Sequence, residues 1–269
     1  MFNAFSGVAR VVLLLSALVI SISGTQAADD YDNFPAPVTA AEVERQFEEA
    51  KATAVKQQQL LMVVLGANWC HDSRDFSDKL EQNEIASQLS PRYHVLKVNV
   101  GYFDTLQPLL GLFDIPVLYG TPTVIVVEPA TGQVLNDATL SYWRSSETHS
   151  VEETLAYFSD YPAQPKNIPE PALSPALVDA LAQIDSFEKE QGERITGAFV
   201  AAGQVMAVSD VHNPPQRFID QWKNLGAVRG RMPDDLAALR AEARTQDAAG
   251  ANPIVLEYPT YSLFTDDTE

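Results

Sequence analysis

The stretch that most constrains the fold of this chain is the apolar run LLMVVLGA at residues 60–67. A run of this length without polar alternation is typical of a strand that other elements cover on both faces. Helical patterns flank it. Residues 39–59 place apolar side chains at helical spacing behind a candidate N-cap, Thr39, and residues 73–90 repeat such a pattern. The sequence therefore predicts a buried strand between two helices.

Strand and helix patterns continue to alternate through the first half of the chain. Strands are expected over 93–100 and 121–129, and a turn centred on Gly132 leads to an edge strand. A short, interrupted helix is expected over 105–115 and a final helix over 150–161. The resulting order, α-β-α-β-α-β-β-α, predicts an α/β fold with a mixed sheet and helices on both of its faces.

The composition changes after the last of these helices. Closely spaced prolines predict an extended linker over 161–173, and a mainly α-helical region is expected over 174–269. Its first helix begins with Ser174 as the N-cap. The separate helices expected here cover residues 174–191, 213–225 and 232–244. The apolar segment 252–264 is expected to dock in an extended form, because it would otherwise expose a large apolar patch.

The first 27 residues have the layout of a secretory signal. A single positive charge, Arg10, precedes the apolar run 11–20, and small residues then lead to an expected cleavage after Ala27 or Ala28. An uncleaved membrane anchor is the alternative, which the shortness of the run disfavours. We therefore expect an exported protein, periplasmic or secreted, without a membrane segment after cleavage.

The charge and the cysteine content limit the classes of partner. With a net charge of −18, the chain is unsuited to nucleic acid and to anionic membrane surfaces. Cys70 is the only cysteine among the 269 residues, so an internal disulfide cannot form. In an oxidising compartment its thiol must be buried, reactive, or paired with another molecule.

The other metal-ligating and aromatic side chains give no sign of a ligand site. Three histidines have no companion at ligand spacing: His94, His149 and His212. Cys70 and the two residues after it are adjacent, and adjacent residues near a helix start rarely converge on one ion. We therefore expect neither a metal site nor a cofactor. Trp143 and Trp222 are expected in the core or at contacts between domains.

Cys70 lies where the buried strand ends and the next helix begins. The first turn of a helix has free N–H groups and a partial positive charge, both of which stabilise a thiolate. Ser73 lies one turn further on, where its hydroxyl group can donate to the thiolate or cap the helix. The charged neighbours have opposite effects. His71 and Arg74 favour a thiolate, whereas Asp72 and Asp75 oppose it. His71 is either a catalytic residue or a solvated residue of the helix start.

Residues 38–160 resemble a thioredoxin-fold domain. The resemblance is carried by the strand LLMVVLGA, by the sequence WCHDS at the family's Trp-Cys-x-x-Cys position, and by the strand GTPTVIVV about fifty residues later. The hairpin PATGQVL and the closing helix VEETLAYFSDY follow in the family's order. The resemblance implies a thioredoxin fold, with the mainly helical region appended to it.

The resemblance also implies roles for individual residues. Cys70 takes the place of the nucleophile that attacks a substrate disulfide, and Trp69 that of the active-site tryptophan. Pro122 matches the cis-proline beside the thiol, and Thr121 matches the residue whose backbone pairs with the substrate. Ser73 occupies the position of the second, resolving cysteine.

Two departures from the family pattern shape the functional hypotheses. A serine cannot resolve a mixed disulfide, and the family's buried acid is replaced by Val64. The first hypothesis is therefore single-thiol exchange at Cys70 with protein or low-molecular-weight thiols and disulfides, as an isomerase or in a glutathione-type reaction. The second is a redox-inactive binding or scaffolding module. The third is a metal or cofactor bridge between two chains through Cys70.

Overall fold

The computed structural model describes residues 32–103, 107–159, 161, 173–207, 209 and 213–263. The expected signal segment, nearly all of the expected linker 161–173, and His212 lie outside these residues. Within the described part of the chain, no helix combines the length and the apolar character needed to cross a membrane.

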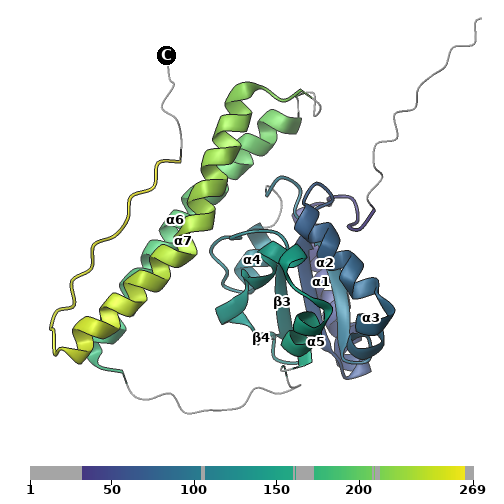
Figure 1. Ribbon diagram of the computed structural model, residues 1–269, viewed down its shortest axis with the longest axis horizontal. Helices are drawn as coiled ribbons and strands as arrows, with labels where there is room; N and C mark the ends of the chain where they lie inside the picture. The colour runs from purple at the N-terminus through teal and green to yellow at the C-terminus, as the bar shows by residue number, and fades with distance from the viewer. Residues whose placement is uncertain are drawn as a thin grey trace, which may run out of the picture. The chain divides into compact units, whose positions relative to one another are not determined.

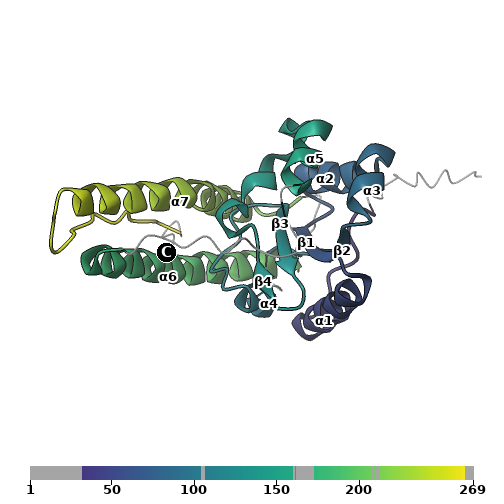
Figure 2. The same cartoon turned by 90° about the horizontal axis from the view of Figure 1, so that it is seen from below.

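A four-stranded sheet forms the centre of the first half of the chain, in the order β2-β1-β3-β4 (Figures 1 and 2). The strands are β1 (Leu60–Gly66), β2 (Tyr93–Asn99), β3 (Thr123–Glu128) and β4 (Gln133–Val134). β1 is parallel to β2 and antiparallel to β3, which in turn is antiparallel to β4. Every residue of β1 is buried, which confirms the prediction made from its unbroken apolar run.

Helices cover both faces of this sheet. They are α1 (Ala40–Gln57) and α4 (Gln107–Leu112) on one face, and α2 (His71–Glu81), α3 (Asn83–Leu89) and α5 (Val151–Ser159) on the other (Figure 2). Two apolar cores result, one on each side of the sheet. Thr39 caps α1 as predicted, because its hydroxyl accepts a hydrogen bond from the amide of Glu42. Two 3₁₀ helices, η1 (Asp137–Thr139) and η2 (Tyr142–Thr148), precede α5.

The prediction of a single helix over 73–90 is wrong. The extended backbone of Gln82 (φ −63°, ψ 132°) separates α2 from α3. At 100° per residue, Phe76 and Ile85 would lie on opposite sides of one straight helix. The break allows both side chains to be completely buried in the same core.

The C-terminal region is a pair of long helices, α6 (Pro175–Ala207) and α7 (Gln216–Ala248), which run side by side (Figures 1 and 2). The predicted N-cap is confirmed, since the Ser174 hydroxyl accepts a hydrogen bond from the amide of Leu177. The prediction of separate helices over 213–225 and 232–244 is wrong, because α7 continues through Pro233. Packing overrides this helix breaker: the neighbouring Met232 and Leu236 are fully buried.

The end of the described chain runs along this pair of helices without regular structure. Ile254, Tyr261 and Leu263 are buried, and the Tyr261 hydroxyl donates to the Asp235 carboxylate at 2.9 Å. The prediction of a docked, extended end segment is therefore confirmed as far as residue 263.

The helical pair also contacts the sheet domain. The Tyr119 hydroxyl donates to Glu188 on α6, and the Arg144 guanidinium donates to the carbonyl of Gly230 on α7 at 3.4 Å. Apolar side chains of both parts form one continuous core. The helical region is thus packed against the first domain through polar and apolar contacts.

Candidate active site

Cys70 lies between the end of β1 and the start of α2, as predicted. It is the N-cap residue of α2, with an extended backbone (φ −93°, ψ 120°), and its side chain does not cap the helix. The thiol is half-buried, and its Sγ donates a hydrogen bond to the Thr121 carbonyl at 3.3 Å. The thiol therefore lies beside the free N–H groups of a helix start and against a backbone oxygen.

The strand register explains how Cys70 meets a residue far away in the sequence. Leu65, at the end of β1, pairs with Thr123, at the start of β3, so the segments just beyond these two residues lie close together. The peptide bond between Thr121 and Pro122 is cis, as the resemblance implies. Both residues are buried beside the thiol.

Trp69 lies at the surface, with 43% of its area exposed, and is held by contacts on several sides. Its indole Nε1 donates to the carbonyl of Gly101 at 2.9 Å. Its ring stacks on Tyr102 at 6.3 Å between centroids and meets Phe103 and Trp222 edge to face at 5.7 and 5.8 Å. Trp222 belongs to α7, which confirms its expected place at a contact between the two parts of the chain. Trp143, in contrast, is completely buried in the core, as also predicted.

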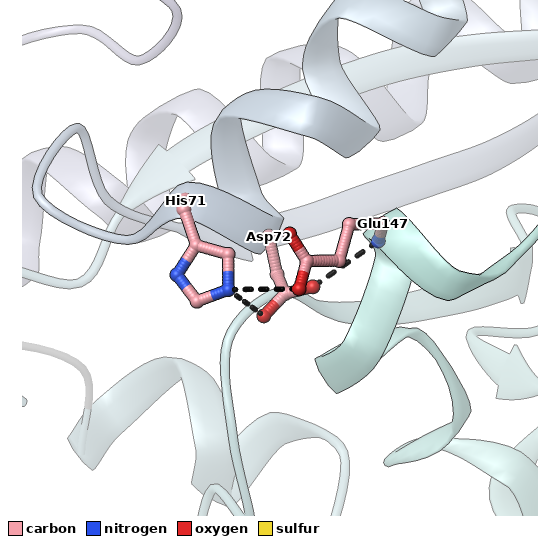
Figure 3. A group of neighbouring side chains, drawn as sticks. All are labelled: His71, Asp72 and Glu147. Atoms are coloured by element: carbon pink, nitrogen blue, oxygen red, sulfur yellow. Dashed lines mark hydrogen bonds and ion pairs between the residues drawn. The ribbon is translucent and has the colours of Figure 1, made fainter.

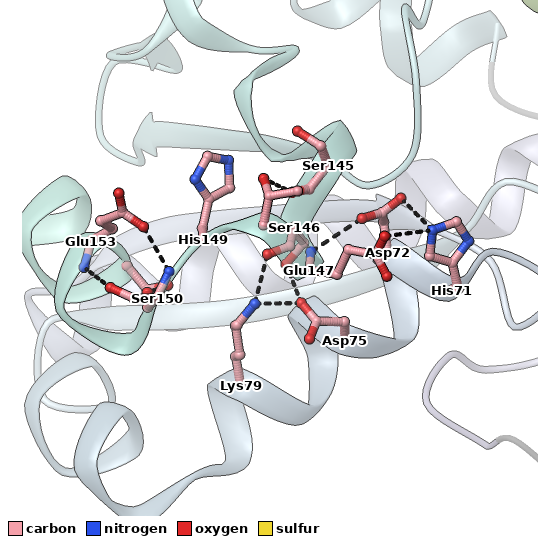
Figure 4. Close-up of polar contacts among 12 residues, drawn as sticks. His71, Asp72, Asp75, Lys79, Ser145, Ser146, Glu147, His149, Ser150 and Glu153 are labelled. Carbon is pink, nitrogen blue, oxygen red and sulfur yellow. Dashed lines mark hydrogen bonds and ion pairs between the residues drawn. The ribbon is translucent and has the colours of Figure 1, made fainter.

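The two acids that were expected to oppose a thiolate are bound to η2 instead. The carboxylate of Asp75 accepts hydrogen bonds from Lys79 at 2.5 Å and from the Ser146 hydroxyl at 2.7 Å. The carboxylate of Asp72 accepts one from the amide of Glu147 at 3.2 Å (Figure 4). These contacts turn both carboxylates towards η2, and the hydrogen bonds compensate part of their negative charge.

His71 is exposed, and its imidazole lies between two carboxylates. Nε2 is 3.1 Å from Oδ2 of Asp72 and 3.5 Å from Oε1 of Glu147 (Figure 3). One ligand atom from each of these residues lies within 4.8 Å of the other two, a spacing that can hold a metal ion. The expectation concerned Cys70, His71 and Asp72, whereas the group that the structure brings together is His71, Asp72 and Glu147. The absence of a metal stays a prediction, as does a catalytic role for His71.

Ser73 is completely buried, and its hydroxyl has no hydrogen-bond partner among the described groups. The hydrogen bond that the sequence suggested between Ser73 and the Cys70 thiol is therefore not formed. Ser73 does not cap α2 either, because that helix has no side-chain cap. Its place at the resolving position rests on the sequence resemblance alone.

Sequence reasoning missed a cation that α7 brings to this site. The guanidinium carbon of Arg229 lies 4.2 Å from the ring centroid of Phe103 and 5.0 Å from that of Phe199. Burial lowers the pKa of Arg229 to about 10, the charge of Cys70 acts in the opposite direction, and Arg144 adds to the lowering. At this pKa the side chain is still cationic at neutral pH. No sequence signal could have found it, because α7 resembles no part of the thioredoxin pattern.

A comparison with family models agrees with the architecture of the first half of the chain. Residues 42–129 match a family model described as thioredoxin-like. The crystal structure of a disulphide isomerase from Xylella fastidiosa Temecula1 is similar, with 24% identity, a TM-score of 0.40, and coverage of 47% of this chain and 93% of that one. A comparison with curated proteins gave no match. The fold is thus α/β, a thioredoxin-like domain followed by a mainly helical region.

Proposed function

We propose that this chain is an exported thioredoxin-like protein that exchanges disulfides through the single thiol of Cys70. The observation that carries the proposal is the contact between Cys70 Sγ and the Thr121 carbonyl at 3.3 Å, beside the cis peptide bond to Pro122. This contact brings the only thiol of the chain to the backbone segment that is expected to pair with a substrate. Trp69 forms the exposed rim of the same site.

The proposed reaction needs no cofactor. The Cys70 thiolate attacks one sulfur of a substrate disulfide, a bond forms between the two sulfurs, and the substrate S–S bond breaks. The leaving sulfur departs as a thiolate and takes a proton from water. A second thiolate, either from the same substrate or from a low-molecular-weight thiol, then attacks the mixed disulfide and releases Cys70. The first route isomerises a protein disulfide, and the second resembles glutathione exchange.

Ser73 makes an external second thiol necessary, because a hydroxyl group does not attack a disulfide under these conditions. In this proposal the mixed disulfide therefore persists until such a thiol arrives. Thr121 and Pro122 form the edge against which the substrate docks, while Trp69 and His71 lie on either side of the nucleophile in the sequence.

Mass spectrometry after incubation with glutathione disulfide tests this function. We expect the wild-type protein to gain one glutathionyl group and lose it again when reduced glutathione is added. Cys70→Ser should gain none, while the matched control Ser73→Ala should react like the wild type. A folded wild-type protein that does not form the adduct would rule the proposal out.

Export is the second part of the proposal and rests on the N-terminal sequence. Fractionation of cells that express the full chain, followed by N-terminal sequencing, should find a mature protein that begins after Ala27 or Ala28 outside the cytoplasm. A protein that keeps its first residues and stays in the cytoplasm would contradict this part and leave the chemistry of Cys70 untouched.

A redox-inactive binding module is the alternative, favoured by the contact of Trp222 on α7 with Trp69. In that case the helical region and the thioredoxin-like domain form one partner-binding unit, and the thiol is dispensable. Replacing Cys70 by alanine in the native host separates the two functions. If the Cys70→Ala strain loses the function of the protein, exchange is supported, whereas full function supports the binding module.

A further inference from the structure

The guanidinium group of Arg229 is largely shielded from solvent and lies over two aromatic rings. Two of its nitrogens, Nε and Nη1, are shielded from solvent and have no hydrogen-bond partner among the described groups. No ion pair joins it to a described carboxylate at 4.0 Å or less. Its contacts are the aromatic faces of Phe103 and Phe199.

Such an arrangement is unfavourable unless an anion shares the site. A shielded charge without a polar partner is strongly disfavoured, and cation–π contacts offset only part of this cost. Arg144 is its other charged neighbour and makes the position worse, because two cations repel one another. An anion placed here would therefore gain from both arginines.

The thiol of Cys70 can become this anion. Phe103, which carries the guanidinium on its face, packs against Trp69, the residue before Cys70. The charge of Cys70 acts on Arg229 favourably, in the direction that keeps the guanidinium protonated. In its protonated state the thiol donates to the Thr121 carbonyl. Loss of the proton removes that hydrogen bond and leaves a negative sulfur beside an oxygen, so the thiolate needs positive charge from elsewhere.

We infer that Arg229 is the counter-charge of the Cys70 thiolate. The C-terminal helical pair then supplies the residue that stabilises the thiolate of the exchange site. This inference rests on the proposed function only in that exchange requires the thiolate. It names the element that sets the reactivity of Cys70, and it gives the helical region a part in the chemistry.

The other charged groups around the thiol do not replace Arg229. The charged residues among the first five of α2 and in η2 are His71, Asp72, Arg74, Asp75, Arg144 and Glu147. The three acids make the contacts with His71, Lys79 and η2 described above. Arg74 donates to the carbonyl of Asn68 at 2.7 Å, and Arg144 donates to that of Gly230. Arg229 is the cation among them whose buried nitrogens have no such acceptor.

The rate at which iodoacetamide alkylates Cys70, measured from pH 5 to pH 10, tests the inference. Iodoacetamide is neutral, so its approach is insensitive to the charge that is removed. Arg229→Gln should lower the rate at pH 6 about tenfold, the change expected when a unit charge within about 10 Å is removed at an effective dielectric constant of about 20. The half-maximal rate should move to higher pH. Arg229→Lys, which restores the positive charge, should return the rate at pH 6 to within about threefold of the wild type.

Arg231→Gln is the matched control, because Arg231 lies on the same helix, is exposed, and pairs with Asp235 at 3.1 Å. Its profile should equal that of the wild type. Circular dichroism and tryptophan fluorescence check that the helical pair stays docked in each variant. An unchanged profile in a folded Arg229→Gln variant overturns the inference, as does a folded Arg229→Lys variant that behaves like Arg229→Gln.

The two proposals fail separately in these experiments. If the wild type forms no glutathione adduct but Arg229→Gln still slows alkylation, the exchange function is wrong and the counter-charge stands. If the adduct forms and alkylation is equally fast in both proteins, the counter-charge is wrong and the exchange function stands.

Discussion

Replacing Gly192 by alanine should weaken the packing of α6 against the thioredoxin-like domain. A Cβ atom added at this position would lie 2.7 Å from the carbonyl oxygen of Pro116 and 3.0 Å from its carbonyl carbon. Both of these are backbone atoms, so they cannot move aside as the end of a flexible side chain would. Either α6 or the segment that contains Pro116 must shift.

Two opposing contributions set the size of the effect. Alanine is more favourable than glycine inside a helix by about 1 kcal/mol, whereas an overpacked contact costs about 1–3 kcal/mol. Gly197 lies on the same helix and has no atom within 4 Å of an added Cβ, so Gly197→Ala should show the favourable contribution alone. The free energies of unfolding of the two variants should therefore differ by about 1–3 kcal/mol, with Gly197→Ala the more stable.

Urea unfolding followed by circular dichroism measures this difference, and tryptophan fluorescence reports on the contact between Trp69 and Trp222. Gly192→Ala should have the lower midpoint and an altered fluorescence spectrum, and its alkylation profile should shift towards that of Arg229→Gln. If both glycine variants raise the midpoint equally and leave alkylation unchanged, then α6 does not approach Pro116 as described, and the coupling between the two regions is refuted.

Three further predictions concern the thiol, the sheet and alkaline stability. Ser73→Cys should supply the missing resolving thiol, so the glutathione adduct of Cys70 should fail to accumulate and an intramolecular disulfide should appear in the mass spectrum; a persistent adduct would contradict this. Asn136→Ala should lower the free energy of unfolding by about 2–4 kcal/mol in urea titrations, because the buried amide bonds an N–H and a carbonyl of β3 at 2.8 Å each; a loss below 1 kcal/mol would contradict it. Burial raises the pKa of Tyr157 to about 12, so the neutral hydroxyl stabilises the fold fully below pH 10, and this contribution is lost as the pH rises from 10 through 12. Tyr157→Phe should therefore lose less stability than the wild type over that interval, and an equal loss would show that Tyr157 does not titrate there.

The sheet and most of its helices were predictable because their signals are local. An unbroken apolar run, a threonine before a helical pattern and a glycine in a turn each act over a few residues, and β1, Thr39 and Gly132 behave as these signals indicate. The positive φ of 79° at Gly132 is the conformation that a tight turn after β3 requires.

The helix boundaries that were wrong depend on packing across the molecule. The break at Gln82 allows Phe76 and Ile85 to enter one core, and no rule of helix propensity contains that requirement. The continuity of α7 through Pro233 has the same origin, since buried residues on both sides of the proline hold the helix in place. Local sequence is least informative where a distant surface decides which side chain is buried.

The charge balance at Cys70 depends on the tertiary structure in the same way. From the sequence, two acids and two basic residues follow the thiol, and their effects cannot be summed without the direction of each side chain. In the structure, Asp72 and Asp75 turn to groups of η2, while α7 adds Arg229, a cation that no local pattern indicates. Because η2 binds the acids and α7 supplies the counter-charge, thiolate formation at Cys70 should depend on both segments as well as on α2. A variant that frees Asp75 from Ser146, such as Ser146→Ala, should therefore slow alkylation in the same direction as Arg229→Gln, although Ser146 makes no contact with the thiol in the described structure.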